Sequence, residues 1–263
     1  MAGHSLDLEI IIPARNEEER LGPTVQSLSR HMRNLPLTWA LRVVDNGSSD
    51  RTLECVDRLA SSGIAVTATG CSRPGKGAAV ARGMLTSRAT WRGFCDADLA
   101  TSADALDDAV TLLRQGFDVA VGSRRCPGAH VRTRQPVLRR LGGAGFRLLS
   151  RPLAGPVADT QCGFKFFTAD AARFLFRDLT APGFVFDLEL VARARASGMR
   201  IAEFPVTWDD RSGSTFRPVR HLWQTAAELR RVYETVRGLR KDGAGARRPL
   251  PSGDSGPAPA RTR

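Results

Sequence analysis

The sequence is poor in the residues that build disulfide frameworks, histidine metal sites and membrane spans. Its five cysteines, at positions 55, 71, 95, 126 and 162, are odd in number and form no C-x-x-C pair, so we expect no disulfide framework and a reducing compartment. The four histidines show no metal-ligand spacing. No stretch approaches the roughly 18 consecutive apolar residues of a membrane-spanning helix, and residues 1–9 lack the pattern of a secretory signal. We therefore expect a cytoplasmic protein.

Acidic residues are also in the minority. The sequence has 27 Asp and Glu residues and 39 Lys and Arg residues, which gives a formal net charge of +12. This excess favours anionic partners: nucleic acid, phosphorylated small molecules or an anionic membrane surface. Residues 122–155 contain eight arginines and no acid. A solvated basic face would account for such a run, but the lack of any compensating acid favours an anion site. Aromatic residues are not interleaved there for base stacking, which argues against nucleic acid.

The rest of the composition, 42% hydrophobic and 25% charged, is that of a globular domain. Apolar β-branched runs alternate with helical patterns along the first 122 residues, and the connections are short. This alternation predicts an α/β fold with a mostly parallel central sheet flanked by helices. We expect strands at residues 8–14, 41–45, 64–69, 91–95 and 118–122, and helices that start near 16, 50, 78 and 102 and reach about 33, 61, 87 and 115.

Polar motifs follow these predicted strands, at the sheet edge where ligands bind in parallel α/β folds. Asp96-Ala97-Asp98 places two carboxylates next to each other, and their repulsion would be relieved by Mg²⁺ or Mn²⁺ bound with a pyrophosphate. A solvated loop is the alternative, since D-x-D is short. The loop 73–77 is basic and flexible, which suits a phosphate or a nucleotide base. Neither a P-loop nor a G-x-G-x-x-G motif is present.

Taken in order, eight segments resemble family-2 glycosyltransferases with the GT-A fold, most closely the dolichyl- or polyprenyl-phosphate glucose and mannose synthases. The resemblance covers residues 8–217, and DTQCGFK is closer to the glucose-type branch. The segments are IIPARNEEERL, VVDNGSSDRT, GKGAAVARGM, FCDADLAT, VGSRR, DTQCGFKFF, GFVFDLELVARA and EFPVTWDDRSGS.

This resemblance implies roles for residues that match the family motifs. The metal ligands would be Asp96 and Asp98. Three positions depart from the family: Asn46 replaces a second aspartate, Ala100 stands where related mannose synthases carry a glutamine ligand, and Thr215 replaces a lysine. The implied nucleotide-sugar site comprises Pro13, Ala14, Glu17, Asp45, Gly47, Lys76, Asp96 and Ala97.

The acceptor side is expected in the second half of the chain. Acids in apolar surroundings need a partner or a function; we expect Glu189 to pair with Arg193 or Arg195, and Asp159 and Asp187 to serve the acceptor. The predicted catalytic residues are Asp159, Asp187 and Arg211, and the predicted acceptor-phosphate residues are Arg124, Arg140, Lys165 and Ser214.

The resemblance implies an inverting hexosyltransferase that moves a sugar, expected to be glucose, from a UDP-sugar to a polyprenyl or dolichyl phosphate, with a GDP-sugar as the alternative donor. A soluble hydroxyl acceptor, with Asp187 or Asp159 as general base, is the second hypothesis, and a non-enzymatic nucleic-acid-binding protein is the third. We divide the chain into a catalytic domain (1–217), an amphipathic helix (218–240) and a disordered basic tail (241–263). The helix either packs on the domain or lies in the membrane interface, where the basic segment would add peripheral attachment to the inner face of the cell membrane.

Overall fold

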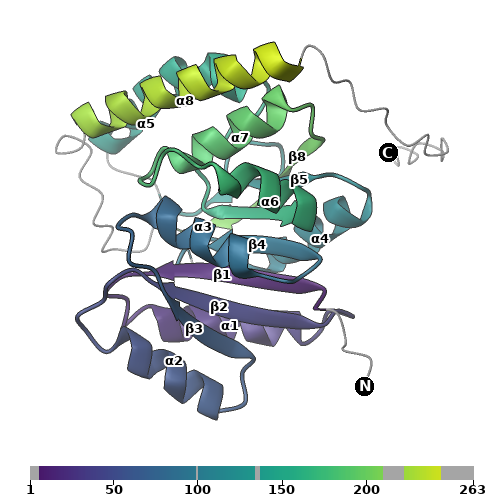
Figure 1. The fold of residues 1–263 in the computed structure, drawn as a ribbon. Coiled ribbons are helices and arrows are strands. Elements are labelled where there is room, and N and C mark those ends of the chain that lie inside the picture. The colour runs from purple at the N-terminus through teal and green to yellow at the C-terminus, as the bar shows by residue number, and fades with distance from the viewer. Residues whose placement is uncertain (1–5, 99, 134–136, 210–221, 244–263) are drawn as a thin grey trace.

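The computed structural model describes residues 6–98, 100–133, 137–209 and 222–243. Their core is a seven-stranded sheet in the order β3-β2-β1-β4-β7-β5-β8. Strand β7 runs antiparallel to β4 and β5, and the other neighbours are parallel, so the predicted mostly parallel α/β sheet is confirmed (Figure 1). The strands are β1 (Leu8–Ala14), β2 (Trp39–Asp45), β3 (Val66–Gly70), β4 (Trp91–Cys95), β5 (Val119–Ser123), β7 (Phe164–Thr168) and β8 (Ile201–Pro205), and a small separate pair is formed by β6 (His130–Val131) and β9 (Thr207–Trp208).

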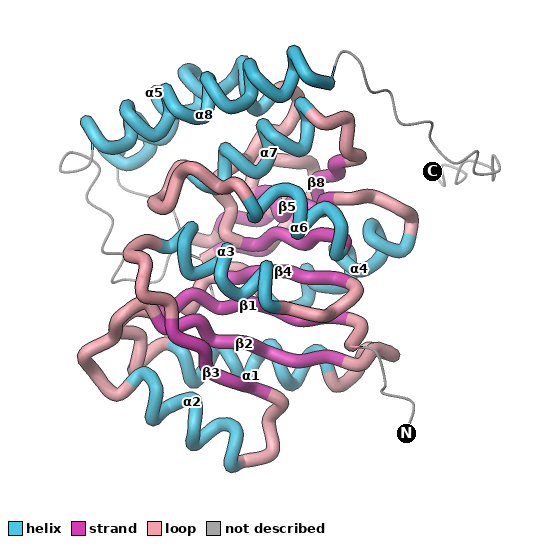
Figure 2. Tube along the Cα trace, viewed as in Figure 1, coloured by secondary structure: helices cyan, strands magenta, loops and turns pink. Residues whose placement is uncertain are grey.

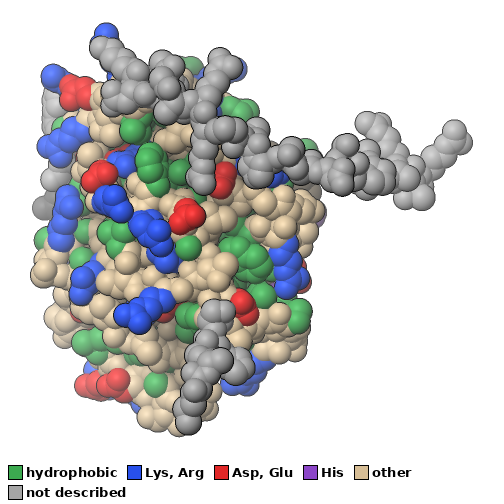
Figure 3. Space-filling view, turned by 45° about the vertical axis from the view of Figure 1, so that its right-hand side comes forward, with side chains coloured by type: hydrophobic (Ala, Val, Ile, Leu, Met, Phe, Trp, Pro, Cys, Tyr) green, Lys and Arg blue, Asp and Glu red, His purple; other side chains and the backbone are tan. Residues whose placement is uncertain are grey.

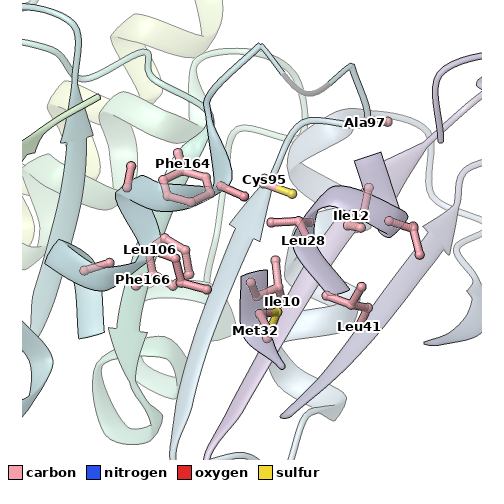
Figure 4. Packing of buried hydrophobic residues seen from close by; sticks show 14 of the residues in the cluster. Ile10, Ile12, Leu28, Met32, Leu41, Cys95, Ala97, Leu106, Phe164 and Phe166 are labelled. Atoms are coloured by element: carbon pink, nitrogen blue, oxygen red, sulfur yellow. The ribbon is translucent and has the colours of Figure 1, made fainter. Parts of the chain in front are cut away.

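Helices cover both faces of the sheet (Figures 1 and 2). Side chains alternate along β1: Ile10 and Ile12 pack with α1, α2 and α4, whereas Ile11 packs with α3, α6 and α7. Figure 4 shows the first of these layers, where Leu28 and Met32 of α1 meet the sheet. The helices are α1 (Leu21–Met32), α2 (Thr52–Ser61), α3 (Lys76–Thr86), the short η1 (Ala103–Ala105), α4 (Leu106–Arg114), α5 (Val137–Ala154), α6 (Ala169–Arg177), α7 (Phe186–Ala196) and α8 (Leu222–Gly243).

The predicted strands and helices of the first half agree with the structure within a few residues, except at the start of α1. We expected this helix to open at Asn16, but it begins at Leu21. Asn16 has a left-handed φ of +56°, which an α-helix does not adopt, and the backbone N–H groups of Glu17 and Glu18 donate to the side chains of Thr52 and Asp50. The acidic run is therefore tied to the start of α2 and does not enter the helix.

Helix α8 packs on the domain. Its Val232 and Val236 are buried in the same layer as α7, and Glu228 accepts hydrogen bonds from the backbone N–H groups of Gly183 and Val185, just before α7. Packing, one of the two arrangements we considered for this helix, is thus the observed one. Beyond Gly243, the predicted tail lies outside the described residues. In the part of the chain that is described, no helix has the length and apolar character needed to cross a bilayer.

Candidate active site

A cleft of about 690 Å³ opens at the edge of the sheet where β1, β2, β4 and β5 end. Strand β7 is antiparallel, so it starts at this same edge, and the residues before it complete the wall. The cleft therefore gathers segments that are far apart in the sequence. It is lined by Pro13, Ala14, Arg15, Asn16, Glu17, Arg20, Leu28, Asn46, Gly75, Lys76, Ala79, Cys95, Asp96, Ala97, Asp98, Ala100, Thr101, Arg124, Gln161, Gly163, Phe164, Phe184, Asp187 and Trp208.

Most of the predicted nucleotide-sugar residues line this cleft, but Asp45 and Gly47 do not. The carboxylate of Asp45 accepts hydrogen bonds from the backbone N–H groups of Gly47 (3.2 Å) and Ser48 (3.3 Å). Gly47 has a φ of +82°, a left-handed conformation that favours glycine. These two residues build the turn after β2, and the neighbouring Asn46 is the one that reaches the cleft.

The acids after β4 form the negative centre of the cleft. The Lys76 Nζ lies 2.5 Å from an Asp96 carboxylate oxygen. Burial opposes the charge on Lys76, but attraction to Asp96 and Asp187 outweighs it and raises the Lys76 pKa. A Cβ on Gly163 would lie 2.3 Å from the Asp96 carboxylate, so the glycine of the DTQCG segment leaves room for this acid.

Two further carboxyl groups in the cleft hold their protons more tightly than usual. Burial, and then repulsion from Asp96, raise the pKa of Asp98, although the Ala100 N–H donates to it at 3.1 Å. Burial also raises the pKa of Glu17; the Arg20 guanidinium opposes this rise and Asp98 adds to it. The carboxylates therefore repel one another in the absence of a cation.

Among the described residues, no group of three or more His, Cys, Asp or Glu side chains could hold a metal ion. Asp96 and Asp98 nevertheless fit a divalent cation that takes its remaining ligands from a substrate, because Mg²⁺ is commonly bound by one or two carboxylates plus phosphate oxygens. Their mutual repulsion is the charge conflict that such a cation relieves. Ala100 contributes no side-chain ligand, in line with the sequence.

Across the cleft, Arg124 is held by a buried acid. Its Nε lies 2.7 Å and its Nη2 2.9 Å from the two carboxylate oxygens of Asp159, and the guanidinium lies 5.3 Å from the ring centroid of Trp208. Burial raises the pKa of Asp159, but the hydrogen bonds and charge of Arg124 outweigh it and hold that pKa below its usual value. Glu203 fixes the loop by accepting from the backbone N–H groups of Ala158 and Asp159.

Asp159 itself is 3% exposed and does not line the cleft. It acts on the cleft through Arg124, which it holds in the wall. Lys165 is also absent from the lining. Its side chain is fully buried, donates to the Cys162 carbonyl at 2.6 Å and hydrogen-bonds Asp187. Asp187 does line the cleft, and burial raises its pKa against the attraction of Lys165.

Of the remaining predictions, the ion pair of Glu189 is observed, and three predicted site residues cannot be placed from the described part of the chain. Glu189 pairs with Arg193 at 3.5 Å, as expected, and accepts from the Thr180 and Ala181 N–H groups. Arg211 and Ser214 lie outside the described residues, and Arg140 lies in α5 at a position whose side chain is not described.

Sequence reasoning assigned no role to several residues that line the cleft. Arg20 could have been found, because its spacing of three from Glu17 is that of a helical ion pair, and the two lie 2.8 Å apart. Trp208 stands in a motif that was recognised, but its position over Arg124 depends on β9 and could not be read from spacing. Arg15, Thr101 and Phe184 are further examples.

Comparison with known proteins gives consistent results. The family model Glycosyl transferase family 2 matches residues 9–176. A dolichyl-phosphate beta-glucosyltransferase of Trichomonas vaginalis is 37% identical over 76% of this chain, and the match spans 63% of that relative, which is less than two thirds of its length. A second one from the same organism is 32% identical over 86% of this chain and 72% of its own length.

Among solved structures, glucosyl-3-phosphoglycerate synthase from Mycobacterium tuberculosis, in complex with Mn²⁺, UDP-glucose and phosphoglyceric acid, aligns with a TM-score of 0.63. The alignment covers 90% of this chain and 80% of that one at 22% identity. At this identity the likeness concerns the fold alone.

Proposed function

The chain belongs to glycosyl transferase family 2, and from that premise we propose that it is an inverting hexosyltransferase that moves glucose from UDP-glucose to a polyprenyl-type phosphate. The observation that carries the proposal is the charge arrangement of the cleft. Asp96 and Asp98 lie at its centre, and the cations Lys76 and Arg124 also line it. Carboxylates that bind a divalent cation, with basic groups nearby, suit a sugar diphosphate. Because the chain belongs to a family of glycosyltransferases, we no longer propose a non-enzymatic nucleic-acid-binding protein.

The donor and the acceptor are proposed from the relatives. Both Trichomonas proteins are named for glucose transfer to dolichyl phosphate, and the Mycobacterium enzyme that shares the fold was solved with UDP-glucose. On our proposal, the segment at the end of β1, from Pro13 to Glu17, holds the nucleoside, and Lys76 lies beside the diphosphate. A GDP-sugar remains the alternative donor.

The cofactor follows from the same acids. Asp96 and Asp98 would hold Mg²⁺ or Mn²⁺ together with the diphosphate, and the bound cation would stabilise the charge of the departing UDP as a Lewis acid. The Mycobacterium structure was solved with Mn²⁺. Lys76 keeps its positive charge because its pKa is raised, so it adds a fixed charge on the same side.

In the reaction we propose, an oxygen of the acceptor phosphate attacks the anomeric carbon from the face opposite UDP. The new C–O bond forms as the bond to the diphosphate breaks, UDP leaves with the electron pair, and the configuration inverts. A phosphate that is already ionised needs no general base, so positioning and charge shielding carry the step. Arg124, fixed by Asp159 and Trp208, is well placed in the cleft to orient the acceptor.

One observation favours a second candidate acceptor, a soluble hydroxyl compound. Asp187 reaches the cleft and has a raised pKa, which suits a general base that must accept a proton. The Mycobacterium enzyme of the same fold is named for a phosphoglycerate product. Asp159 suits this role less, because Arg124 occupies both its oxygens.

We also propose peripheral attachment to a membrane surface, and we assign it to α5. Leu148 and Leu149 are 72% and 62% exposed there, next to Arg147 and Arg151, and Tyr233 of α8 donates to the Leu149 carbonyl. Adjacent apolar side chains with arginines around them suit an anionic bilayer surface. The face of the molecule drawn in Figure 3 carries Lys and Arg side chains among hydrophobic ones and a few acidic ones.

Donor binding is tested by thermal unfolding with Mn²⁺ and a panel of UDP- and GDP-sugars. A ligand at about 100 times its dissociation constant adds about 2.7 kcal/mol to the free energy of unfolding. We expect UDP-glucose with Mn²⁺ to give the largest rise in Tm. The absence of a shift with every sugar nucleotide would contradict the proposal.

A further inference from the structure

Asn46 makes three hydrogen bonds to one loop at the mouth of the cleft. It follows β2 and lines the cleft. Its Nδ2 donates to the carbonyl oxygens of Cys71 (3.0 Å) and Arg73 (2.8 Å), and its Oδ1 accepts from the Gly75 N–H (2.8 Å). A single side chain thus holds residues 71–75, the connection between β3 and α3.

An aspartate at this position could not make the same contacts. An ionised carboxylate only accepts hydrogen bonds, so it would keep the Gly75 contact and face two carbonyl oxygens with no proton to share. Asn46 stands where the family motif named above has its second aspartate. The replacement of aspartate by Asn46 therefore supplies a hydrogen-bond donor at two of the three contacts, where a carboxylate could only accept.

The other side of the loop is fixed by the residues before α7. The Gly77 N–H donates to the Pro182 carbonyl at 2.8 Å. Gly75 has a φ of +120°, and a Cβ at this position would lie 2.3 Å from the same carbonyl oxygen. The loop is thus held between Asn46 and Pro182, in a backbone conformation that requires glycine.

This loop leads directly into Lys76, the first residue of α3, whose Nζ pairs with Asp96. We propose that Asn46 is a positioning residue that holds the loop 71–75, and with it Lys76, in the donor-binding conformation before the donor arrives. The identity of the donor rests on the proposed function; the fastening of the loop does not.

The energetic consequence concerns binding rather than chemistry. When only a fraction of molecules has the competent loop conformation, the apparent dissociation constant rises by the inverse of that fraction. Once the donor is bound, the loop is in place and the chemical step is unchanged. Loss of the Asn46 contacts should therefore raise KM for the sugar nucleotide and leave kcat nearly constant.

The test compares the full-length wild type with Asn46→Asp and Asn46→Ala. The first variant keeps the shape and loses both donated bonds, and the second loses all three contacts without adding charge. Asn34→Asp is the matched control, because it makes the same chemical change at an exposed turn after α1. Amide hydrogen exchange of residues 71–77 is measured without ligand, and kcat and KM are measured with UDP-glucose and Mn²⁺.

We expect faster exchange in the loop and a roughly tenfold rise in KM in both Asn46 variants, with kcat within about twofold of wild type and no change in the control. The proposal is overturned if exchange in the loop is unchanged, if exchange rises without any change in KM, or if kcat falls while KM stays constant. If the wild type shows no transfer with UDP-glucose, the proposed function fails. The exchange data, which need no donor, still decide whether Asn46 fastens the loop.

Discussion

At the scale of single residues, the cleft is defined by carboxyl groups that are costly to ionise together. Asp98 and Glu17 both have raised pKa values, mainly because they are buried, and each is near a further acid. Such groups bind a metal only in the ionised form, so protons compete with the cation. The pH at which binding fails should therefore lie above the ordinary carboxyl range of about 4.

The first prediction follows from the direction of these shifts. A carboxyl group whose pKa is raised by folding stabilises the protein below its unfolded pKa, and this contribution is lost as the pH rises through the folded pKa. Without ligand, Asp98 and Glu17 should therefore cost stability at neutral pH. The rise in Tm caused by Mn²⁺ and UDP should grow between pH 4 and pH 7, as measured by thermal unfolding. A ligand-induced rise in Tm that stays constant or shrinks over this range would contradict the assignment of these acids to the metal and donor site. In Asp98→Asn, the rise in Tm should depend less on pH.

A second prediction concerns Asp159, which we first expected to be catalytic. Removal of one partner from a buried ion pair costs about 3–5 kcal/mol, and since Arg124 is partly exposed we expect Asp159→Asn to lower the free energy of unfolding by about 3 kcal/mol. KM for the acceptor should rise as Arg124 loses its orientation. Urea denaturation and steady-state kinetics measure the two effects. A variant that keeps its stability but loses kcat by orders of magnitude would instead identify Asp159 as a catalytic base.

At the scale of helices and strands, α5 and α8, which both pack on α7, have different surfaces. The apolar stripe of α8 is used in packing, since Val232 and Val236 are buried. The adjacent apolar side chains of α5, Leu148 and Leu149, are exposed. Membrane attachment and folding stability should therefore respond to different helices.

We expect Leu148→Glu with Leu149→Glu to abolish flotation on anionic liposomes while Tm changes little. The glutamates replace apolar insertion with repulsion from anionic lipid. Leu53→Glu and Leu85→Glu, at exposed leucines of α2 and α3, are the matched controls and should float like wild type. Flotation that survives the α5 substitutions would show that this surface is not the contact.

The opposite result is expected for α8. Val236→Ala removes two buried methyl groups and should lower the free energy of unfolding by about 1–3 kcal/mol, with liposome binding unchanged at a temperature where the variant is folded. Denaturant titration and flotation of the same sample check both statements. If Val236→Ala lost liposome binding and kept normal stability, α8 would instead be the helix that contacts the membrane.

The secondary structure was predictable where the signal is local. Buried strands are apolar and alternate with amphipathic helices. Strand β1, for example, is an apolar run that ends with Pro13 and Ala14. Strand β7 was not predicted, because its five residues, FKFFT, include a fully buried lysine whose charge is paired with Asp187 from α7. The start of α1 was misplaced because Asn16 has a left-handed φ of +56° and the residues after it are bound to Thr52 and Asp50, contacts that no local pattern reveals.

At the scale of the whole molecule, the cleft depends on which strands become neighbours. Sequence motifs located Asp96, Asp98 and Lys76, because each follows or precedes a recognisable element. They could not show that Arg124 binds Asp159, which is 35 positions away, or that Asn46 binds the loop before α3. Those contacts follow from the strand order: β3 lies beside β2, and β5 lies beside β7. Loop-to-loop pairing of this kind leaves no periodic signal in the sequence.

Above all, we propose that this cleft transfers glucose from UDP-glucose to a lipid phosphate with the help of Asp98 and a divalent cation. The most direct test offers labelled UDP-glucose to the full-length protein with a short polyprenyl phosphate and phosphoglyceric acid together, with Mn²⁺ or with EDTA. We predict a glucosylated lipid phosphate of inverted configuration, formed with Mn²⁺, lost in EDTA and lost in Asp98→Ala. Transfer only to the soluble acceptor, or full transfer by Asp98→Ala in EDTA, would contradict this proposal.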